Sequence, residues 1–316
     1  MRIAVTGGAG YIGSILVKRL LEEGYKVATL DNQSTGNNRY LRPLKTAALE
    51  IIEGDIRNPL DLDRAFKNAD AVVHAAALSD LDTCNEKPEE AVSVNIYGTY
   101  RLLEAALRNS VRRIVFCSSA AVYGVPKTLP VTERDALHPL NLYGITKLTG
   151  EKLIESCHLN NGVETVCLRF GNVYGVGLYT NWIGVIPKFV SLGVEGKPLT
   201  IYGDGSSTRD FVHIEDIIHA ITLSITTKGI KMETLNIGSE TTNINEVADI
   251  VSQEVKKAMN KSVPLTHLPP RQGETKEFSY DTSRIRRVLG FEPKWKLVDG
   301  IKQIVQYRLD SQRQRI

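Results

Sequence analysis

The chain has 316 residues, 42% of them hydrophobic and 24% charged, which is typical of an ordinary globular protein of about two domains. Lys and Arg number 39 against 36 for Asp and Glu, so the charge gives no reason to expect a nucleic-acid partner. No apolar run approaches the ~18 residues that a membrane span needs, and we expect neither a membrane anchor nor a signal peptide.

The first half of the chain alternates short apolar runs with amphipathic stretches. Buried strands are predicted at residues 2–6, 26–30, 49–53, 70–76, 112–119 and 164–170. Helices are predicted between most of them, at residues 11–23, 59–67, 86–109 and 141–160, and the polar stretch 32–47 is the weakest helix candidate. This alternation predicts an α/β fold, a Rossmann-like doubly wound parallel sheet covered by helices on both faces.

Beyond about residue 171 the pattern loosens into segments rich in Gly and Pro. Later helices are predicted at residues 182–193, 214–227, 244–260 and 298–309. We expect residues 1–171, with contributions from later segments, to form one domain and residues 172–316 to form a smaller, irregular α/β domain. Loops displayed on a rigid scaffold usually carry substrate contacts, so the second domain is the expected place for them.

The cysteines and histidines predict no metal site. The four cysteines have neither CxxC nor metal-ligand spacing, and the six histidines form no HExxH or similar pair. We therefore expect buried, reduced thiols and a cytoplasmic location. The cysteines are Cys84, Cys117, Cys157 and Cys167.

A glycine-rich turn follows the first predicted strand and opens the first predicted helix. Gly7, Gly10 and Gly13 have the spacing that permits a tight turn, close approach of a pyrophosphate, and helix–strand packing. The N–H groups at the helix N-terminus would then face an anion. Three glycines can merely form a turn, but Asp31 also ends the second strand, where a carboxylate accepts hydrogen bonds from adenosine ribose hydroxyls. Because this carboxylate would repel a 2′-phosphate, we predict that residues 1–171 bind NAD rather than NADP.

Tyr143 and Lys147 lie one helical turn apart in "NLYGITKLTGEKLI". Such a pair alone is more often a solvated surface pair, but the hydroxyl-rich strand end "FCSSAAVYG" precedes it at the edge where such sheets bind ligands. The helix also contains two glycines, each costing roughly 1 kcal/mol against alanine. We expect Gly144 to leave the phenol unobstructed and Gly150 to let a neighbouring element approach closely.

The order of these motifs resembles that of the extended short-chain dehydrogenases/reductases. The chain carries in sequence "TGGAGYIGS", "GDI", "HAAA", "VNIYGT", "SSAAVYG", "YGITK", "LRFGNVYG", "RDFVHIED" and "PPRQGE". More narrowly, it is similar over nearly its whole length to NAD-dependent nucleotide-sugar epimerases of the UDP-glucose (UDP-galactose) 4-epimerase type.

The resemblance implies an NAD cofactor and a set of residues that hold it, with adenine held by Asp55 and Ile56. The implied cofactor residues are Gly7, Gly10, Tyr11, Ile12, Gly13, Asp31, Asn32, Asp55, Ile56, Ala75, Ala76, Ala77, Asn95, Tyr143, Lys147 and Phe170.

The resemblance also implies a catalytic set of Ser119, Tyr143 and Lys147. Tyr143 would exchange a proton with the sugar C4 hydroxyl, and Lys147 with the nicotinamide ring would lower its pKa from the usual value near 10. Ser119 would bind the C4 oxygen, with Ser118 as second choice, and Lys147 would hold the nicotinamide ribose. Hydride would pass from C4 to NAD and back to the other face of a 4-keto sugar. Ala120 and Ala121 occupy the stretch where related dehydratases and some decarboxylases carry an acidic residue, which favours a plain C4 cycle.

The implied substrate is a UDP-sugar held mainly by the second domain. Arg209 and Arg271 would grip the diphosphate bidentately. Phe278 would restrict the space beside the hexose C2, which favours UDP-glucose or UDP-galactose, whereas Gly171 in place of a larger residue would enlarge the pocket. The implied substrate residues are Ser119, Asn172, Tyr202, Arg209, Arg271, Glu274 and Phe278.

Several functions stay open at this point. The enzyme could instead epimerise an N-acetylhexosamine or uronate, or act as a nucleotide-sugar reductase or dehydrogenase that consumes NAD(H) stoichiometrically. A silent NAD-sensing or scaffold protein of the same fold is a third class, against which the complete Ser119, Tyr143 and Lys147 set argues. Resemblance further implies a homodimer through the predicted helices 86–109 and 141–160.

Overall fold

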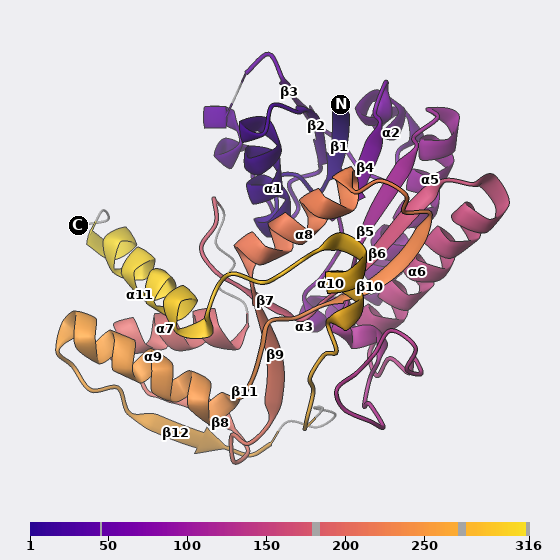
Figure 1. Cartoon of the computed structure of the whole chain (residues 1–316). Helices are drawn as coiled ribbons and strands as arrows, with labels where there is room; N and C mark the ends of the chain where they lie inside the picture. Colours follow the sequence, from indigo (N-terminus) through magenta and orange to yellow (C-terminus); the bar gives the residue numbers. More distant parts are fainter. Residues whose placement is uncertain (45, 179–183, 271–275, 314–316) are drawn as a thin grey trace.

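The centre of the molecule is a seven-stranded parallel sheet with the strand order β10-β6-β5-β4-β1-β2-β3 (Figure 1). The computed structural model describes residues 1–44, 46–178, 184–270 and 276–313. Six of the seven strands are those that the apolar runs predicted. The strands are β1 (Arg2–Thr6), β2 (Lys26–Asp31), β3 (Leu49–Glu53), β4 (Ala71–His74), β5 (Arg113–Ser119), β6 (Glu164–Phe170) and β10 (Met232–Ile237).

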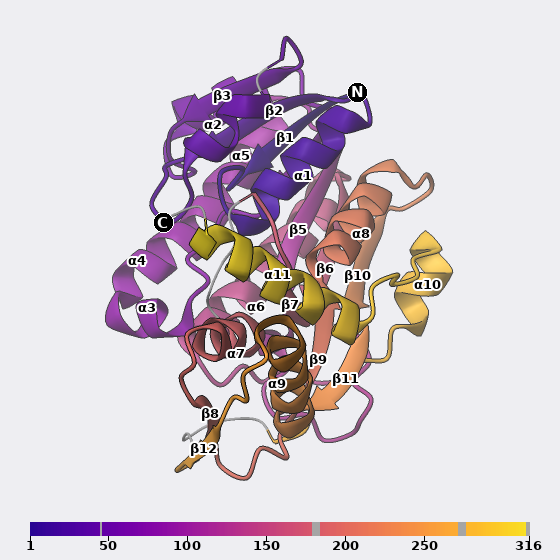
Figure 2. The ribbon, with the colours of Figure 1, turned by 90° about the vertical axis from the view of Figure 1, so that its left-hand side faces the viewer.

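Helices cover both faces of this sheet because successive strand residues point to opposite sides. Ile3 and Val5 of β1 join one apolar core, whereas Ala4 between them joins the other. The first core packs under α1 (Tyr11–Glu22), α8 (Ile214–Thr226) and α10 (Ser283–Leu289), and Figure 2 shows α1 and α8 in front of the sheet. The second core packs under α2 (Pro59–Phe66), α5 (Thr99–Arg108) and α6 (Leu142–Asn161). The predicted doubly wound fold is confirmed.

The helical boundaries follow local capping. The Asn141 side chain accepts a hydrogen bond from the Gly144 N–H at the start of α6, and Gly162 ends that helix with a φ of 71°. The segment predicted as one helix over residues 86–109 consists of α4 (Pro88–Val92), a π-helical turn and α5. A short helix that the sequence did not predict, α3 (Leu81–Glu86), precedes it. Within residues 32–47 the described backbone forms two 3₁₀ turns rather than an α-helix.

The second half of the chain forms a smaller, irregular α/β layer around a third apolar core, as predicted (Figure 2). Strand β10 and helices α8 and α10 nevertheless belong to the large sheet, so a cut at residue 171 does not separate the two layers. The elements of the smaller part are β7 (Asn172–Tyr174), α7 (Val185–Val194), β8 (Leu199–Tyr202), β9 (Thr208–His213), β11 (Glu240–Asn243), α9 (Ile244–Met259), β12 (Leu265–Leu268) and α11 (Leu297–Arg313).

No helix in the described ranges is long and apolar enough to cross a membrane.

Candidate active site

The glycine-rich turn between β1 and α1 forms a cradle at the carboxyl edge of the sheet. A Cβ on Gly7, which has a φ of +72°, would lie 2.7 Å from the Ala76 nitrogen, and one on Gly13 would lie 2.0 Å from the Gly7 oxygen. Gly10 is less crowded, with only the Gly7 oxygen at 3.2 Å, and it opens α1 without a side-chain cap. An uncapped helix start beside a bare backbone fits a dinucleotide pyrophosphate.

The predicted cofactor residues converge on one cavity. All of them except Asn95 line it, from the glycine turn through the ends of β2, β3 and β4 to Tyr143, Lys147 and Phe170. The carboxyl ends of these parallel strands share one edge of the sheet, which is why residues distant in sequence meet there. The residues present therefore fit NAD along the whole cavity.

Asp31 lies in the cavity wall with both carboxylate oxygens oriented by the backbone. Its Oδ2 accepts a hydrogen bond from the Ala9 N–H at 2.9 Å and its Oδ1 accepts one from the Gln33 N–H at 2.7 Å. Burial raises the pKa of Asp31, and these two N–H donors oppose that rise. Each carboxylate oxygen has further acceptor capacity, so the site can take ribose hydroxyls as predicted.

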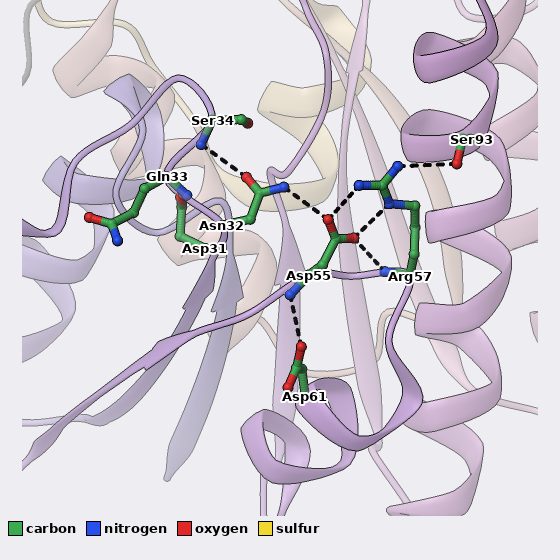
Figure 3. Close-up of polar contacts among 8 residues, drawn as sticks. All are labelled: Asp31, Asn32, Gln33, Ser34, Asp55, Arg57, Asp61 and Ser93. Atoms are coloured by element: carbon green, nitrogen blue, oxygen red, sulfur yellow. Dashed lines mark hydrogen bonds and ion pairs between the residues drawn. The ribbon is translucent and has the colours of Figure 1, made fainter.

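Asp55 is less available than predicted (Figure 3). Its Oδ2 accepts from Asn32 Nδ2 at 3.0 Å and from Arg57 Nη2 at 2.6 Å, while its Oδ1 accepts from the Arg57 backbone N–H and Nε. The hydrogen bond with Arg57 is the main reason that the pKa of Asp55 falls to about 2. A carboxylate has about four acceptor positions, so Asp55 could bind an adenine amino group only in exchange for one of these donors.

Asn95 does not line the cavity, and the prediction that it contacts the cofactor is not supported. Its side chain donates to the Leu78 carbonyl at 2.9 Å and to Thr146 Oγ1 at 3.0 Å, and it accepts from the Leu78 N–H at 2.8 Å. All its hydrogen-bonding groups thus tie the segment after β4 to α6. Nothing in the sequence around Asn95 indicated the π-helical turn that turns it inward.

The three predicted catalytic side chains lie together where α6 meets the end of β5. Lys147 is 4% exposed, and its Nζ donates to the Cys117 carbonyl at 2.8 Å and lies 5.8 Å from the Tyr143 ring centroid. The Ser119 side chain lies close enough to Tyr143 to lower the pKa of its phenol, and its Oγ accepts a hydrogen bond from the Ala121 N–H at 3.2 Å. This geometry can hold a hydroxyl or carbonyl oxygen between a phenol and a serine, with an ammonium behind them.

The protein alone does not lower the pKa of the phenol, contrary to the expectation from Lys147. Burial raises the pKa of Tyr143 to about 12, and only the Ser119 side chain acts in the opposite direction. Burial also lowers the pKa of Lys147 to about 8. Both shifts have one cause, because a low-dielectric site disfavours the charged form of each group.

The two glycines of α6 are places of close contact. A Cβ on Gly144 would lie 2.6 Å from the Ala121 oxygen, and one on Gly150 would lie 2.6 Å from Cζ of Phe116. The predicted close approach at Gly150 is confirmed. Position 144 requires glycine because the backbone of the segment after β5 lies against it. From the sequence alone, we expected clearance around the Tyr143 phenol instead.

The described residues expected to bind substrate lie outside the cavity just described. Asn172 lies on β7, Tyr202 ends β8, and Arg209 lies on β9, where its Nη1 donates to the Thr208 carbonyl at 2.8 Å. Arg271 and Glu274 lie outside the described residues. The substrate roles of all these residues remain predictions.

Two expectations about the sugar pocket change in the structure. Phe278 is 7% exposed and packs against the rings of Tyr123 and Tyr280, so its ring is part of an aromatic cluster behind the segment after β5. A Cβ on Gly171 would lie 2.7 Å from the Asp210 oxygen. The expectation that this glycine enlarges the sugar pocket is therefore wrong, because the missing side chain points into strand β9.

Several cavity residues were not predicted to hold the cofactor, among them Ser118, which was only the second choice for the catalytic hydroxyl. Most follow strand ends already singled out, so extending each motif by one or two residues would have found them. Glu90 and Val94 gave no such signal, because the sequence did not show that their helix borders the cavity. The additional lining residues are Leu30, Ser34, Thr35, Gly54, Leu78, Ser79, Glu90, Val94, Cys117, Ser118 and Val173. Among the residues that the structure describes, no group of three or more His, Cys, Asp or Glu could hold a metal ion.

Comparison with known proteins agrees with this site. The model of the NAD dependent epimerase/dehydratase family matches residues 3–238. The chain belongs to this family. It is 35% identical to a putative UDP-glucose 4-epimerase of Methanocaldococcus jannaschii, covering 98% of this chain and 99% of that protein.

Two solved structures are similar over nearly the whole chain. A UDP-glucose 4-epimerase of Thermotoga maritima with UDP-glucose has a TM-score of 0.89 at 30% identity, covering 99% of this chain and 100% of that one. A UDP-glucuronic acid 4-epimerase of Bacillus cereus in complex with UDP-glucuronic acid and NAD has a TM-score of 0.89 at 33% identity, covering 98% and 100%. The predicted resemblance to UDP-glucose 4-epimerases is confirmed, with NAD as cofactor and the isomerase class.

Proposed function

We propose that this enzyme inverts C4 of a UDP-hexose, interconverting UDP-glucose and UDP-galactose through a transient 4-keto sugar. The observation that carries the proposal is that Tyr143 and Lys147 line the cavity that fits NAD, with Ser119 beside Tyr143 just outside the cavity lining. The segment that follows Ser119 supports a plain C4 cycle, because Ala120 and Ala121 offer no acid or base for elimination of water.

Bound NAD supplies a hydride acceptor and donor together with a positive charge. Tyr143 removes the proton from the C4 hydroxyl and later returns it, while Ser119 holds the C4 oxygen by a hydrogen bond. Lys147 stabilises the phenolate electrostatically, an effect that burial strengthens. The Cys117 carbonyl fixes the ammonium in place, 2.8 Å from Nζ.

The sugar is the open part of this proposal, since the similar Bacillus cereus enzyme acts on UDP-glucuronic acid. The pure protein should be incubated separately with UDP-galactose, UDP-glucuronic acid and a UDP-N-acetylhexosamine, and the products separated by chromatography. We expect UDP-glucose from UDP-galactose with no net change in nicotinamide absorbance. Conversion of only the uronic or N-acetylated sugar would sink the substrate choice, and stoichiometric NADH formation would indicate a dehydrogenase.

Tyr143→Phe tests the mechanism. Loss of the acid/base should lower kcat by about 10²- to 10⁴-fold while NAD still binds. Tyr307→Phe is the matched control, because Tyr307 lies on α11 outside the cavity. Full activity of Tyr143→Phe would remove Tyr143 from its proposed role.

We also propose a homodimer formed through the helices of residues 86–109 and 141–160, in a reducing, cytoplasmic location. Large apolar side chains that are 43–48% exposed on these helices support the interface: Val92, Tyr97, Tyr100 and Ile145. The four cysteines are all free, which supports the location. Light scattering on the purified protein as it elutes from a size-exclusion column should give twice the chain mass of 35.0 kDa, and a mass equal to one chain would rule the dimer out.

A further inference from the structure

Glu151 is a buried carboxylate on the catalytic helix that the proposed chemistry does not use. It lies one turn after Lys147 on α6 and is 5% exposed. Its Oε1 accepts hydrogen bonds from Ser118 Oγ at 2.5 Å and from Arg169 Nε at 2.9 Å, and its Oε2 accepts from Arg169 Nη2 at 2.7 Å. One side chain of α6 is therefore bonded to both β5 and β6.

The Ser118 hydroxyl is the contact that reaches the active site. Ser118 lines the NAD cavity. It lies between Cys117, whose carbonyl accepts a hydrogen bond from Lys147, and Ser119, whose side chain lies beside Tyr143. The strand end thus meets α6 at three consecutive residues. The middle contact is made by Glu151, and the outer two are made by the catalytic lysine and tyrosine.

Arg169 extends the same network to the other side of the catalytic segment. Its Nη1 donates to the Tyr123 hydroxyl at 2.7 Å, and that hydroxyl donates to Asn236 Oδ1 at 2.6 Å. Tyr123 follows the turn whose Ala121 carbonyl touches Gly144. Both ends of the segment after Ser119 are therefore connected to the Glu151–Arg169 pair.

We propose that Glu151, paired with Arg169, is a positioning residue of the active site that fixes the end of β5 against α6 through Ser118. The readouts in turnover rest on the proposed function, since they require a C4 oxidation that uses Tyr143 and Lys147. A buried ion pair is by itself weak evidence for stability, because apolar residues of similar volume often serve as well. What an apolar pair could not supply here is the directional bond to Ser118.

The charge of Glu151 also acts on Lys147. The groups around the ammonium are His74 on β4, Cys84 on α3, Cys117 on β5, and Tyr143 and Glu151 on α6, with Arg169 of β6 facing Glu151. Glu151 raises the pKa of Lys147 against the lowering by burial. Removing the carboxylate charge leaves Arg169 uncompensated, so Lys147 loses its proton at a lower pH.

Ser118→Ala and Glu151→Gln test the proposal. A displacement of about 1 Å at a reacting group can cost about 10²-fold in rate, so we expect kcat to fall about 10- to 100-fold with KM for the sugar changed by less than about 2-fold. In Glu151→Gln the alkaline limb of the kcat profile should move to lower pH, whereas in Ser118→Ala it should stay. A purely structural pair would not produce this difference.

Two matched controls carry the same substitution elsewhere. Glu155→Gln lies one turn further along α6, where Glu155 forms an exposed ion pair with Lys152 at 2.8 Å. Glu164→Gln removes the negative charge from the ion pair with Arg113, which is 2% exposed at the opposite end of β5. We expect Glu164→Gln to lower the melting temperature without changing kcat or its pH profile. We expect Glu155→Gln to leave the melting temperature, kcat and the pH profile unchanged.

Hydrogen–deuterium exchange provides a readout that needs no turnover. The peptide covering residues 117–123 should exchange faster in Ser118→Ala and Glu151→Gln than in the wild type and both controls. If Glu151→Gln does not fold, Ser118→Ala, which leaves the ion pair intact, decides the question. Absence of wild-type turnover on every UDP-sugar would refute the proposed function, while exchange would still decide the positioning role. Unchanged kcat and unchanged exchange in Ser118→Ala would overturn the proposal.

Discussion

Replacing Gly144 by alanine should reduce turnover, although the same change usually stabilises a helix. Alanine in place of an interior glycine gains roughly 1 kcal/mol of helix propensity. At this position, however, the new Cβ would lie 2.6 Å from the Ala121 oxygen and 2.9 Å from Pro139 Cβ. Relief to an ordinary contact near 3.4 Å requires the first turn of α6 to move by about 0.8 Å.

That displacement occurs beside Tyr143 and against a backbone carbonyl that has little freedom to move. Overpacking typically costs about 1–3 kcal/mol, so after the propensity gain the unfolding free energy should fall by about 0–2 kcal/mol. A shift of this size at a reacting group predicts a loss of kcat of about 10- to 100-fold. Both quantities can be measured, by turnover of the UDP-sugar that the wild type converts and by urea unfolding.

Gly150→Ala is the matched comparison on the same helix. Its Cβ would meet the Phe116 ring at 2.6 Å, further along α6 from the phenol. Because the obstacle is a side chain, we expect a comparable loss of stability from overpacking but a loss of kcat below about 10-fold. The reasoning fails if Gly144→Ala keeps the wild-type kcat. It also fails if the unfolding free energy of Gly144→Ala rises by the full helix-propensity difference of roughly 1 kcal/mol.

Three further predictions concern the charged and reactive groups. Asp31→Asn should weaken NAD binding and relax discrimination against NADP, because the carboxylate charge that repels a 2′-phosphate is gone. Calorimetric titration with each dinucleotide measures both affinities, and an unchanged ratio of the two would contradict the prediction. The pKa of Lys147 is lowered to about 8 from the ordinary value of 10.5. Between these two pH values the unfolded state binds more protons than the folded state, so stability rises with pH. Over this pH range the unfolding free energy of the cofactor-free wild type should increase relative to that of Lys147→Met, and a constant difference between the two would refute the shift. The four buried cysteines should react with a thiol reagent only slowly until denaturant is added, and rapid labelling of the native protein would contradict their burial.

The large sheet and many of the residues that line its cavity were predictable because each signal was local. A parallel sheet buried on both faces requires continuous apolar runs, and the turn at its first strand requires glycine at Gly7 and Gly13 for steric reasons. Once the strand order follows from right-handed crossovers, every strand end reaches the same edge. Asp31, Ala76 and Lys147 therefore line one cavity although no local pattern connects them.

The parts that sequence reasoning missed depend on tertiary packing. Asn95 is buried within a π-helical turn and donates to the Leu78 carbonyl, and the Asp55 carboxylate already accepts hydrogen bonds from Arg57. Gly171 was read as a gap in a pocket, but its missing side chain faces the backbone of β9. The short strands of the second half pair through long-range contacts, and strands such as β11, with the sequence ETTN, carry no apolar pattern that separates them from loops.

In the proposed mechanism, the ionisation of Tyr143 and Lys147 depends on the bound cofactor as well as on the polypeptide. The same burial raises the pKa of Tyr143 to about 12 and lowers that of Lys147 to about 8. The chain by itself therefore favours the neutral phenol of Tyr143 and disfavours the protonated form of Lys147. A low-dielectric site strengthens the effect of any charge brought into it. A cationic ring bound in this cavity would favour the phenolate far more than it would in water. Burial thus favours the neutral phenol of Tyr143 in the cofactor-free protein, while the Cys117 carbonyl accepts a hydrogen bond from the Lys147 ammonium and fixes its position.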